Sequence, residues 1–423
     1  MTKVLLAQLD AGVGEAVGRI WPELKLETRF APLLDLELGD VGSDIAIRLA
    51  ESLRLKPDEI AGRICSAWTP PAQVNCSVLN GYINVRFEGA GLETFEEDPL
   101  VVPPTELTIV AAPFSKIPSR LAELRICSSV LCQLLIAKQL EIPAKLLLGG
   151  KSLTLQGGVL ALYRGIIDSL AHRSGGSQAD DFSSAAVLEA CRTSTGVCLW
   201  IAPNALSRDT FVEFCKSVEQ RGQQLWVQGP SAPWLDFRFH TETLHDIAEW
   251  SDDRLSALLW YLAGQTAAMD IDFSIPRIAE RSNIAWFWES TCERAARLVQ
   301  RPSDEGCESR SSMELSPLMR RLGLRAAYLR TFYLRAALQG EVQVFMEALA
   351  DTLITFNRVF NDPGFRIRQS GGKLSEAEIK ILAGAHRSLS DSITLCDFSE
   401  GKRYGSNART PHKANRTIIS NYE

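Results

Sequence analysis

The segment Gly149–Ser152, sequence GGKS, comes nearest in this chain to a phosphate-binding loop. It follows a predicted strand and precedes a predicted helix, where backbone N–H groups can bind an anion. The full phosphate-loop pattern needs a glycine five positions before Gly150, and Lys145 stands there. We therefore interpret the segment as a strand-to-helix turn, with anion contact at the helix N-terminus as the alternative.

The remaining residue types that could do chemistry are scattered. The chain has ten cysteines without a CxxC pair, and it has no GxSxG or HExxH motif. The five histidines are isolated from one another: His172, His240, His245, His386 and His412. The sequence predicts reduced cysteines, no metal site and no cofactor.

A basic and aromatic segment between Ser316 and Gly340 is more informative, because it contains no acidic residue. Arginine and aromatic side chains together suit phosphate contacts and stacking on unpaired bases. The alternative is a solvated helix face whose aromatic residues belong to the core. The residues concerned are Arg320, Arg321, Arg325, Arg330 and Arg335 with Tyr328, Phe332 and Tyr333.

The amino-acid composition limits the class of protein to which the chain can belong. Of the 423 residues, 46% are hydrophobic and 23% charged, which is typical of a folded globular protein. No apolar run approaches the roughly 18 residues of a membrane span, and the N-terminus is a poor signal peptide, so we expect a cytoplasmic protein without membrane insertion. The net charge is −6, but residues 301–423 carry 18 basic against 14 acidic side chains, which indicates a more basic C-terminal part.

The elements that must position these residues form three blocks, and the predicted fold class is α/β plus α. Residues 1–100 predict a small α+β domain with a helix from "GSDIAIRLAESLRL", capped by Ser43 or Asp44, and a half-buried strand from "GYINVRF". Residues 101–240 alternate strand and helix, which predicts a truncated Rossmann-like parallel sheet. Residues 241–400 show helical periodicity throughout and predict a bundle, and residues 401–423 predict a disordered basic tail.

In this order the blocks resemble arginyl-tRNA synthetase, from the N-terminus to about residue 398. The segment "GDVGSDIAIRLAESLRLKPDEIAGRI" and the strand "NGYINVRF" are similar to the domain with which that synthetase binds the tRNA elbow. The segment "AAPFSKIPSRLAELR" is similar to the catalytic "SSPNIAKPLHVGHLR" without a gap. "MDIDFSIPRIAERSNIAWFWESTCERAARL" and "LADTLITFNRVFND" resemble the DALR anticodon-binding domain.

The departures from the synthetase imply a protein that does not charge tRNA. The catalytic "HVGH" becomes Arg120, Leu121, Ala122 and Glu123, so both histidines and the glycine are replaced, and Glu123 puts an anion near the triphosphate position. No KMSKS-like loop is evident, and "DALR" becomes Ser256, Ala257, Leu258 and Leu259. The resemblance therefore implies a catalytically inactive synthetase paralogue.

Two functions fit this interpretation. The first is a tRNA-binding adaptor or regulator, which presents an arginine-type tRNA to a tRNA-modifying enzyme. The second is a protein–protein interaction scaffold that retains the fold and no longer binds tRNA. For the first, the expected elbow contacts are Asn80, Tyr82, Asn84 and Arg86. The expected contacts to the anticodon stem are Arg320, Arg321, Arg325, Asn357 and Arg358.

Overall fold

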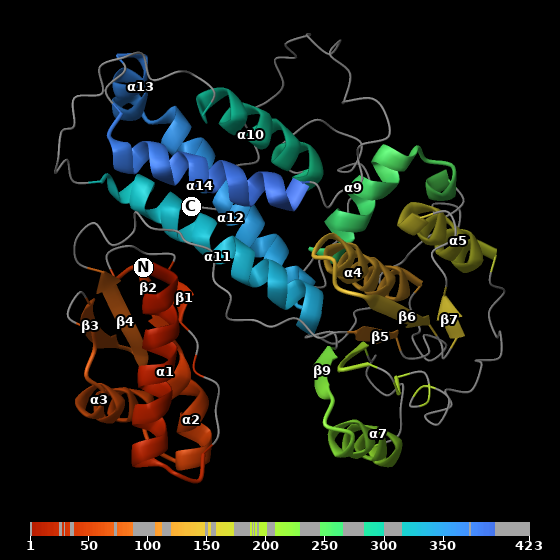
Figure 1. The fold of residues 1–423 in the computed structure, drawn as a ribbon, viewed down its shortest axis with the longest axis horizontal. Coiled ribbons are helices and arrows are strands. Elements are labelled where there is room, and N and C mark those ends of the chain that lie inside the picture. Colours follow the sequence, from red (N-terminus) through yellow and green to blue (C-terminus); the bar gives the residue numbers. More distant parts are fainter. Residues whose placement is uncertain are drawn as a thin grey trace.

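The protein was analysed as a computed structural model. The structure describes residues 2–24, 28, 30–33, 38–71, 74–87, 106–111, 120–148, 151–153, 158–172, 187, 189, 191–192, 194–200, 208–228, 246–264, 283–299, 315–371 and 374–393. The predicted basic tail over residues 401–423 lies outside these ranges. Figure 1 shows an N-terminal α+β unit, a sheet with its helices, and a group of long helices.

The N-terminal unit is a four-stranded antiparallel sheet packed with helices, as the sequence predicts. Its strand order is β1-β2-β4-β3, and its core gathers residues from all three helices and from β2, β3 and β4. The elements are α1 (Thr2–Ile20), β1 (Ala31–Pro32), β2 (Val41–Ser43), α2 (Ile45–Leu53), α3 (Pro57–Ala67), β3 (Val74–Leu79) and β4 (Tyr82–Phe87).

The start of α2 differs in detail from the predicted cap. Asp44 occupies the N-cap position, but its side chain makes no capping hydrogen bond. Its carboxylate instead accepts a hydrogen bond from Arg48 Nε, one turn along the helix, at 3.0 Å. Ser43 is the last residue of β2. The position of the helix start is therefore as expected, while the capping interaction is replaced by an exposed ion pair.

The hairpin between β3 and β4 closes through Asn80 and Gly81, which both have positive φ, 52° and 79°. Two such residues form the tight turn whose twist matches paired strands. The Gly81 N–H donates to Asp58 Oδ1 at 2.5 Å, and a Cβ on Gly81 would lie 2.4 Å from Pro57 Cβ. The first turn of α3 therefore anchors the hairpin, and only glycine fits against it.

The second unit is a five-stranded sheet of order β7-β6-β5-β8-β9. Strands β6, β5, β8 and β9 are parallel, which confirms the Rossmann-like prediction. The elements are β5 (Leu107–Ala111), α4 (Arg120–Gln139), β6 (Ala144–Leu148), β7 (Lys151–Leu153), α5 (Gly158–His172), β8 (Gly196–Trp200), α7 (Arg208–Gln220) and β9 (Gln224–Gln228).

The GGKS segment is not a strand-to-helix turn. Lys151 and Ser152 belong to β7, which pairs antiparallel with β6, with Leu148 opposite Lys151. The two strands therefore form a hairpin, and the nearest following helix, α5, begins only at Gly158. Because no helix N-terminus follows the glycine pair, the geometry needed for the alternative anion site is absent from these described elements.

Long helices make up the rest of the described chain and confirm the predicted helical region. They are α9 (Asp252–Ala263), α10 (Ile284–Val299), α11 (Pro317–Gln339), α12 (Val342–Asn361), α13 (Pro363–Ser370) and α14 (Glu376–Ile393). Trp260, Trp288 and Phe345 meet edge to face inside this region. One continuous core joins α9, α10, α11, α12 and α14 to α4, α5 and the sheet. None of the helices in the described ranges is long and apolar enough to cross a membrane.

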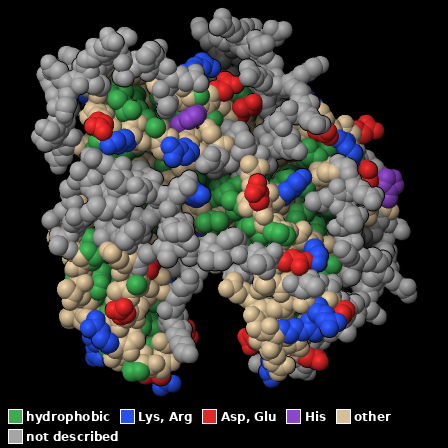
Figure 2. Space-filling view, in the orientation of Figure 1, with side chains coloured by type: hydrophobic (Ala, Val, Ile, Leu, Met, Phe, Trp, Pro, Cys, Tyr) green, Lys and Arg blue, Asp and Glu red, His purple; other side chains and the backbone are tan. Residues whose placement is uncertain are grey.

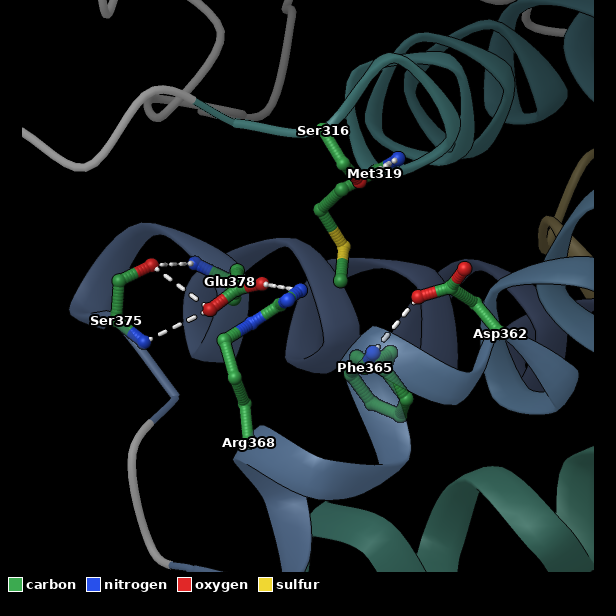
Figure 3. A network of polar contacts seen from close by, with 7 residues as sticks. All are labelled: Ser316, Met319, Asp362, Phe365, Arg368, Ser375 and Glu378. Atoms are coloured by element: carbon green, nitrogen blue, oxygen red, sulfur yellow. Dashed lines mark hydrogen bonds and ion pairs between the residues drawn. The ribbon is translucent and has the colours of Figure 1, made fainter.

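Side-chain caps define three of these helix starts. Ser375 and Glu378 form a reciprocal capping box: the Ser375 hydroxyl accepts from the Glu378 N–H at 3.2 Å, and the Glu378 carboxylate accepts from the Ser375 N–H at 2.9 Å. Figure 3 shows that Glu378 also binds Arg368 of α13, so one carboxylate caps α14 and holds α13 beside it. Asp362 caps α13 and Ser316 caps α11 through one hydrogen bond each, from the Phe365 N–H and the Met319 N–H.

Helix α11 connects the three regions (Figure 1). In its first half, Leu324 and Tyr328 belong to the core of the N-terminal unit. Near its end, Gln133 of α4 donates to the Ala337 carbonyl at 3.0 Å, and Gln228 of β9 donates to the Gln339 carbonyl at 2.7 Å. The predicted basic and aromatic segment is therefore the helix against which the other units pack.

Candidate nucleic-acid interface

The hairpin of β3 and β4 presents two chemically different faces. Val74, Cys76 and Val78 pair with Phe87, Val85 and Ile83 on the side that packs against the helices. Side chains alternate in a strand, so the intervening residues share the opposite side. We call this opposite side the hairpin face, and its members are Asn75, Ser77, Leu79, Tyr82, Asn84 and Arg86.

Most of the hairpin face is open to solvent. Tyr82 is 43% exposed and lies opposite Leu79, at the end next to the exposed turn residue Asn80. Arg86 is also exposed and lies opposite Asn75. An aromatic ring and polar side chains on one flat surface suit stacking and hydrogen bonding to an unpaired base. The structure thus brings together three of the predicted elbow residues: Asn80, Tyr82 and Arg86.

Asn84 is the exception on this face. It is 3% exposed, because β2 lies beside it and Leu33 covers this point of the sheet. A Cβ on Gly42, its partner in β2, would lie 2.7 Å from Leu33 Cδ2 and 3.0 Å from Asn84 Oδ1. The alternation in "GYINVRF" is regular, but the neighbouring strand and Leu33 bury its middle polar residue. Asn84 therefore does not contribute to the exposed surface.

Two of the predicted anticodon-stem arginines bind other elements of the protein: Arg320 is partly exposed and Arg325 is buried. Arg320 of α11 donates to Asp40 at 2.9 Å and to the Phe87 carbonyl at 3.0 Å, and Asp40 also accepts from the Phe87 N–H. Arg325 is 7% exposed and forms an ion pair with Asp351 of α12 at 2.7 Å. Burial lowers the pKa of Arg325, and Asp351 partly opposes this effect. Both arginines hold elements together, which corrects the prediction that they face RNA.

The rest of the α11 segment is mostly internal too. Arg335 pairs with Glu341, and Tyr328 and Tyr333 are buried, with Phe332 stacked on Tyr328. Arg321 is half-buried and remains partly accessible. The alternative of a solvated helix face with core aromatic residues is therefore right for the aromatic residues. It is wrong for most of the arginines, which bind neighbouring elements.

Asn357 is also internal. Its side-chain N–H groups donate to Thr291 Oγ1 at 3.0 Å and to the Leu353 carbonyl at 2.9 Å, and its Oδ1 accepts from Arg294. These bonds link α12 to α10, so the prediction that Asn357 contacts RNA is not supported by its burial. Its neighbour Arg358 points the other way on the helix and is exposed.

A second polar surface surrounds Arg358, at the end of α12. Ile354, Arg358 and Asn361 are exposed and recur at helical spacing. The guanidinium groups of Arg294 and Arg366 lie 5.0 Å and 5.2 Å from the centre of the Phe360 ring. We call this surface the α12 end: Ile354, Arg358, Phe360, Asn361 and Arg366. Arg366 and Phe360 were missed from the sequence, although Arg358, Arg366 and Arg368 fall within eleven residues.

The carboxyl edge of the parallel sheet is where open α/β folds bind nucleotides. In this chain the turn between α11 and α12 packs there. Gly340 has a φ of 76°, and a Cβ on it would lie about 3 Å from atoms of Gln228, Cys198 and Trp200. Trp200 and Gln228 are the last residues of β8 and β9, and Trp200 Nε1 donates to Gln133 at 2.6 Å. At these two strands the helical region fills the edge.

The segment that resembles the catalytic signature begins α4, with Arg120 as its first residue. Glu123 is 4% exposed, so its carboxyl group is turned into the protein. The side chains of Arg120, Leu121 and Ala122 lie outside the described residues. Phe114, which stands opposite the asparagine of "SSPN" in the ungapped comparison, also lies outside them. The described residues contain no cluster of three or more His, Cys, Asp or Glu side chains that could hold a metal ion.

Charge on the surface is mixed. On the face drawn in Figure 2, Lys and Arg side chains lie in separate groups among Asp and Glu. This distribution agrees with the net charge of −6. On this face a nucleic acid would meet local basic groups and not one extended basic field.

Comparisons with known proteins agree with this architecture. A family model described as the arginyl tRNA synthetase N terminal domain matches residues 8–87. The Thermus thermophilus arginyl-tRNA synthetase structure superposes with a TM-score of 0.57 and 11% identity, covering 93% of this chain and 98% of that one. The Plasmodium falciparum arginyl-tRNA synthetase gives 0.56 and 10%, with the same coverage. No curated protein matches significantly by sequence.

The fold is arginyl-tRNA synthetase-like. At this identity the structural similarity establishes the fold and not the activity. The family match covers the unit that carries the hairpin face, because β3 and β4 lie within residues 8–87.

Proposed function

We propose that this protein binds tRNA without charging it, and that it serves as an adaptor or regulator that presents an arginine-type tRNA to a tRNA-modifying enzyme. The observation that carries the proposal is the hairpin face, where Tyr82, Leu79 and Arg86 stay exposed on a domain similar to the synthetase N-terminal domain. An exposed tyrosine on a strand is a ready stacking platform for an unpaired loop base.

The α12 end is the second proposed contact. It offers two exposed guanidinium groups, those of Arg358 and Arg366, beside a partly exposed ring. Cationic side chains position a phosphate backbone without reading its sequence. The two surfaces lie on different units, so a ligand that engages both must be extended, as a folded tRNA is.

Three features support a protein that does not activate an amino acid. Both catalytic histidines of the resembling signature are replaced. The buried Glu123 adds a carboxyl group close to the start of α4. The α11–α12 turn occupies the ends of β8 and β9, so a nucleotide would have to displace packed side chains of Trp200 and Gln228. Each feature weakens binding of ATP or of the adenylation transition state.

A titration of the purified protein against total tRNA, at about 50 and 200 mM salt, tests the binding part. We expect binding that weakens steeply with salt, with one tRNA family enriched in the RNA recovered from the complex. Absence of binding at the lower salt contradicts the proposal.

Arginine-dependent ATP–pyrophosphate exchange tests the catalytic part, with an active arginyl-tRNA synthetase as the positive control. We expect no exchange above a protein-free blank and no measurable binding of a non-hydrolysable ATP analogue. Clear exchange would show that the replaced signature still supports adenylation, and would leave the tRNA-binding proposal standing as a separate matter.

A protein–protein interaction scaffold is the second candidate function. The observation that favours it is the apolar exposure at both proposed contacts: Ile367 of α13 is 72% exposed, beside Arg366, and Leu79 is 46% exposed. Together with internal arginines on α11, such surfaces suit a protein partner as well as RNA. Failure of the tRNA titration, followed by capture of one partner that requires Ile367, would favour this function.

A further inference from the structure

Two cysteines of the N-terminal unit meet side by side. Cys65 lies in the last turn of α3, and Cys76 lies in the middle of β3 on the side that faces the helices. Their Sγ atoms are 3.8 Å apart, although eleven positions separate them in the chain. Both are half-buried, so small reagents can reach them while the protein is folded.

The other cysteines in the described ranges are mostly less accessible. Cys127, Cys132, Cys191, Cys198 and Cys292 are buried, and Cys215 of α7 is half-buried. Burial raises the pKa of Cys132, Cys198 and Cys292, which keeps these thiols protonated and unreactive. The Cys65–Cys76 pair combines a sulfur–sulfur contact with partial exposure of both thiols.

We propose that Cys65 and Cys76 form a reversible dithiol–disulfide site. The elements that carry them already pack together, since α3 lies against β3 and β4, so the two sulfur atoms are neighbours in the folded protein. Neither the tRNA-binding proposal nor its alternative is needed for this inference.

The local chemistry assigns different roles to the two thiols. The hydrogen bond between them lowers the pKa of Cys65 and raises that of Cys76, while burial opposes the first effect and adds to the second. We therefore write the reaction with Cys65 as the attacking thiolate and Cys76 as the resolving thiol. An accessible, acidic cysteine next to a resolving cysteine is the arrangement found at redox-responsive sites.

The reaction balances with a small disulfide as the oxidant. The Cys65 thiolate attacks one sulfur of the small disulfide, a mixed disulfide forms, and one small thiolate leaves. Cys76 then loses its proton and attacks Cys65 Sγ, which releases the second small thiolate. The protein loses two electrons and two protons in total, and the small disulfide is reduced to two thiols.

Mass spectrometry of the tryptic digest tests the proposal directly. Trypsin cleaves after Arg63 and Arg86, and no lysine or arginine lies between them, so both thiols fall on the single peptide 64–86. The folded protein is incubated with oxidised glutathione, remaining thiols are alkylated, and the peptide is weighed. We expect it to be lighter than the reduced peptide by two hydrogen atoms and to regain them with dithiothreitol.

Single variants check that both thiols take part. Cys76→Ser should trap glutathione on Cys65 as a stable mixed disulfide, because no resolving thiol remains, and Cys65→Ser should leave Cys76 without a partner for the internal bond. Cys215→Ser should leave peptide 64–86 unaffected. The proposal is overturned if folded wild-type protein keeps both thiols of this peptide reduced, or carries a separate glutathione on each without an internal bond. The wild-type measurement needs no variant to fold.

Discussion

The hairpin face and helix α11 carry similar residue types and use them in opposite ways. Tyr82 and Arg86 sit on a strand whose outer side faces solvent, so alternation alone leaves them exposed. Tyr328 and Arg325 sit on a helix that is contacted by other elements on most of its circumference, so the same types become internal. Arginine with aromatic residues therefore indicates RNA binding only where the element keeps a free side.

The substitution with the largest expected effect lies at the end of α11. Gly340→Ala puts a Cβ in the left-handed region and against Gln228, Cys198 and Trp200. We expect a loss of about 2–4 kcal/mol in the free energy of unfolding, from backbone strain and overpacking together. Urea denaturation followed by circular dichroism measures it.

Gly165→Ala is the matched control for that substitution. Gly165 lies within α5, and a Cβ there meets no atom within 4 Å. We expect a gain of about 0.5–1 kcal/mol, because alanine is the better helix former. Equal effects at the two glycines would mean that the α11–α12 turn is not packed tightly against the sheet edge.

Arg320→Ala comes next in expected size. It removes the hydrogen bonds to Asp40 and to the Phe87 carbonyl and leaves a nearly buried carboxylate with one internal donor fewer. We expect a loss of about 2–3 kcal/mol in stability, at the lower end of a broken buried pair because Arg320 is partly exposed. Arg358→Ala, on an exposed site, should change stability by less than about 0.5 kcal/mol. A larger loss of stability for Arg358→Ala than for Arg320→Ala would contradict the role given to the Arg320 contacts.

Tyr82→Ala tests the hairpin face itself. If Tyr82 stacks on a base, its loss should weaken tRNA binding by about 1–3 kcal/mol with little change in stability. Val78→Ala is the control, because Val78 has a similar exposure on the other side of the same hairpin. Filter binding at one salt concentration compares the two. An unchanged affinity for Tyr82→Ala would leave the face without a role in RNA binding.

The smallest effect is expected at the α12 end. Arg358→Glu with Arg366→Glu should lower tRNA affinity at low salt and reduce the slope of log K against log salt by about two, since two phosphate contacts are lost. Reversal of Arg192 and Arg63, exposed arginines on other units, changes the net charge equally and should leave the slope almost unaltered. Similar slopes for both double variants would assign the salt dependence to overall charge.

Much of the fold follows from local pattern, and the failures have physical causes. The helix α1 escapes prediction because Gly12, Gly14 and Gly18 weaken its helical signal, although Leu9, Val13, Ala16 and Val17 keep the apolar spacing. Gly12 is required by tertiary packing, since a Cβ on it would lie 2.6 Å from Trp68 Nε1. The glycines disfavour this helix, and burial of its apolar residues in the core of the N-terminal unit stabilises it.

The candidate site was predictable only where one element determines exposure. Tyr82 and Arg86 follow from strand alternation. The burial of Asn84 depends on Leu33, and the burial of Arg320 depends on Asp40, 280 positions away, so neither is visible in a local window. Strand β7 was not predicted for a related reason: a three-residue strand is too short to show an alternation of apolar and polar residues.

Helix α11 also sets a fixed length within the molecule. Its 23 residues span about 34 Å at 1.5 Å per residue, with the Asp40 contact at one end and the Gln228 contact at the other. Inserting one residue between these ends would rotate one contact by about 100° relative to the other. The helix therefore acts as a spacer. The number of residues between its two contacts fixes both the distance from the N-terminal unit to the sheet and the direction in which each contact faces around the helix axis.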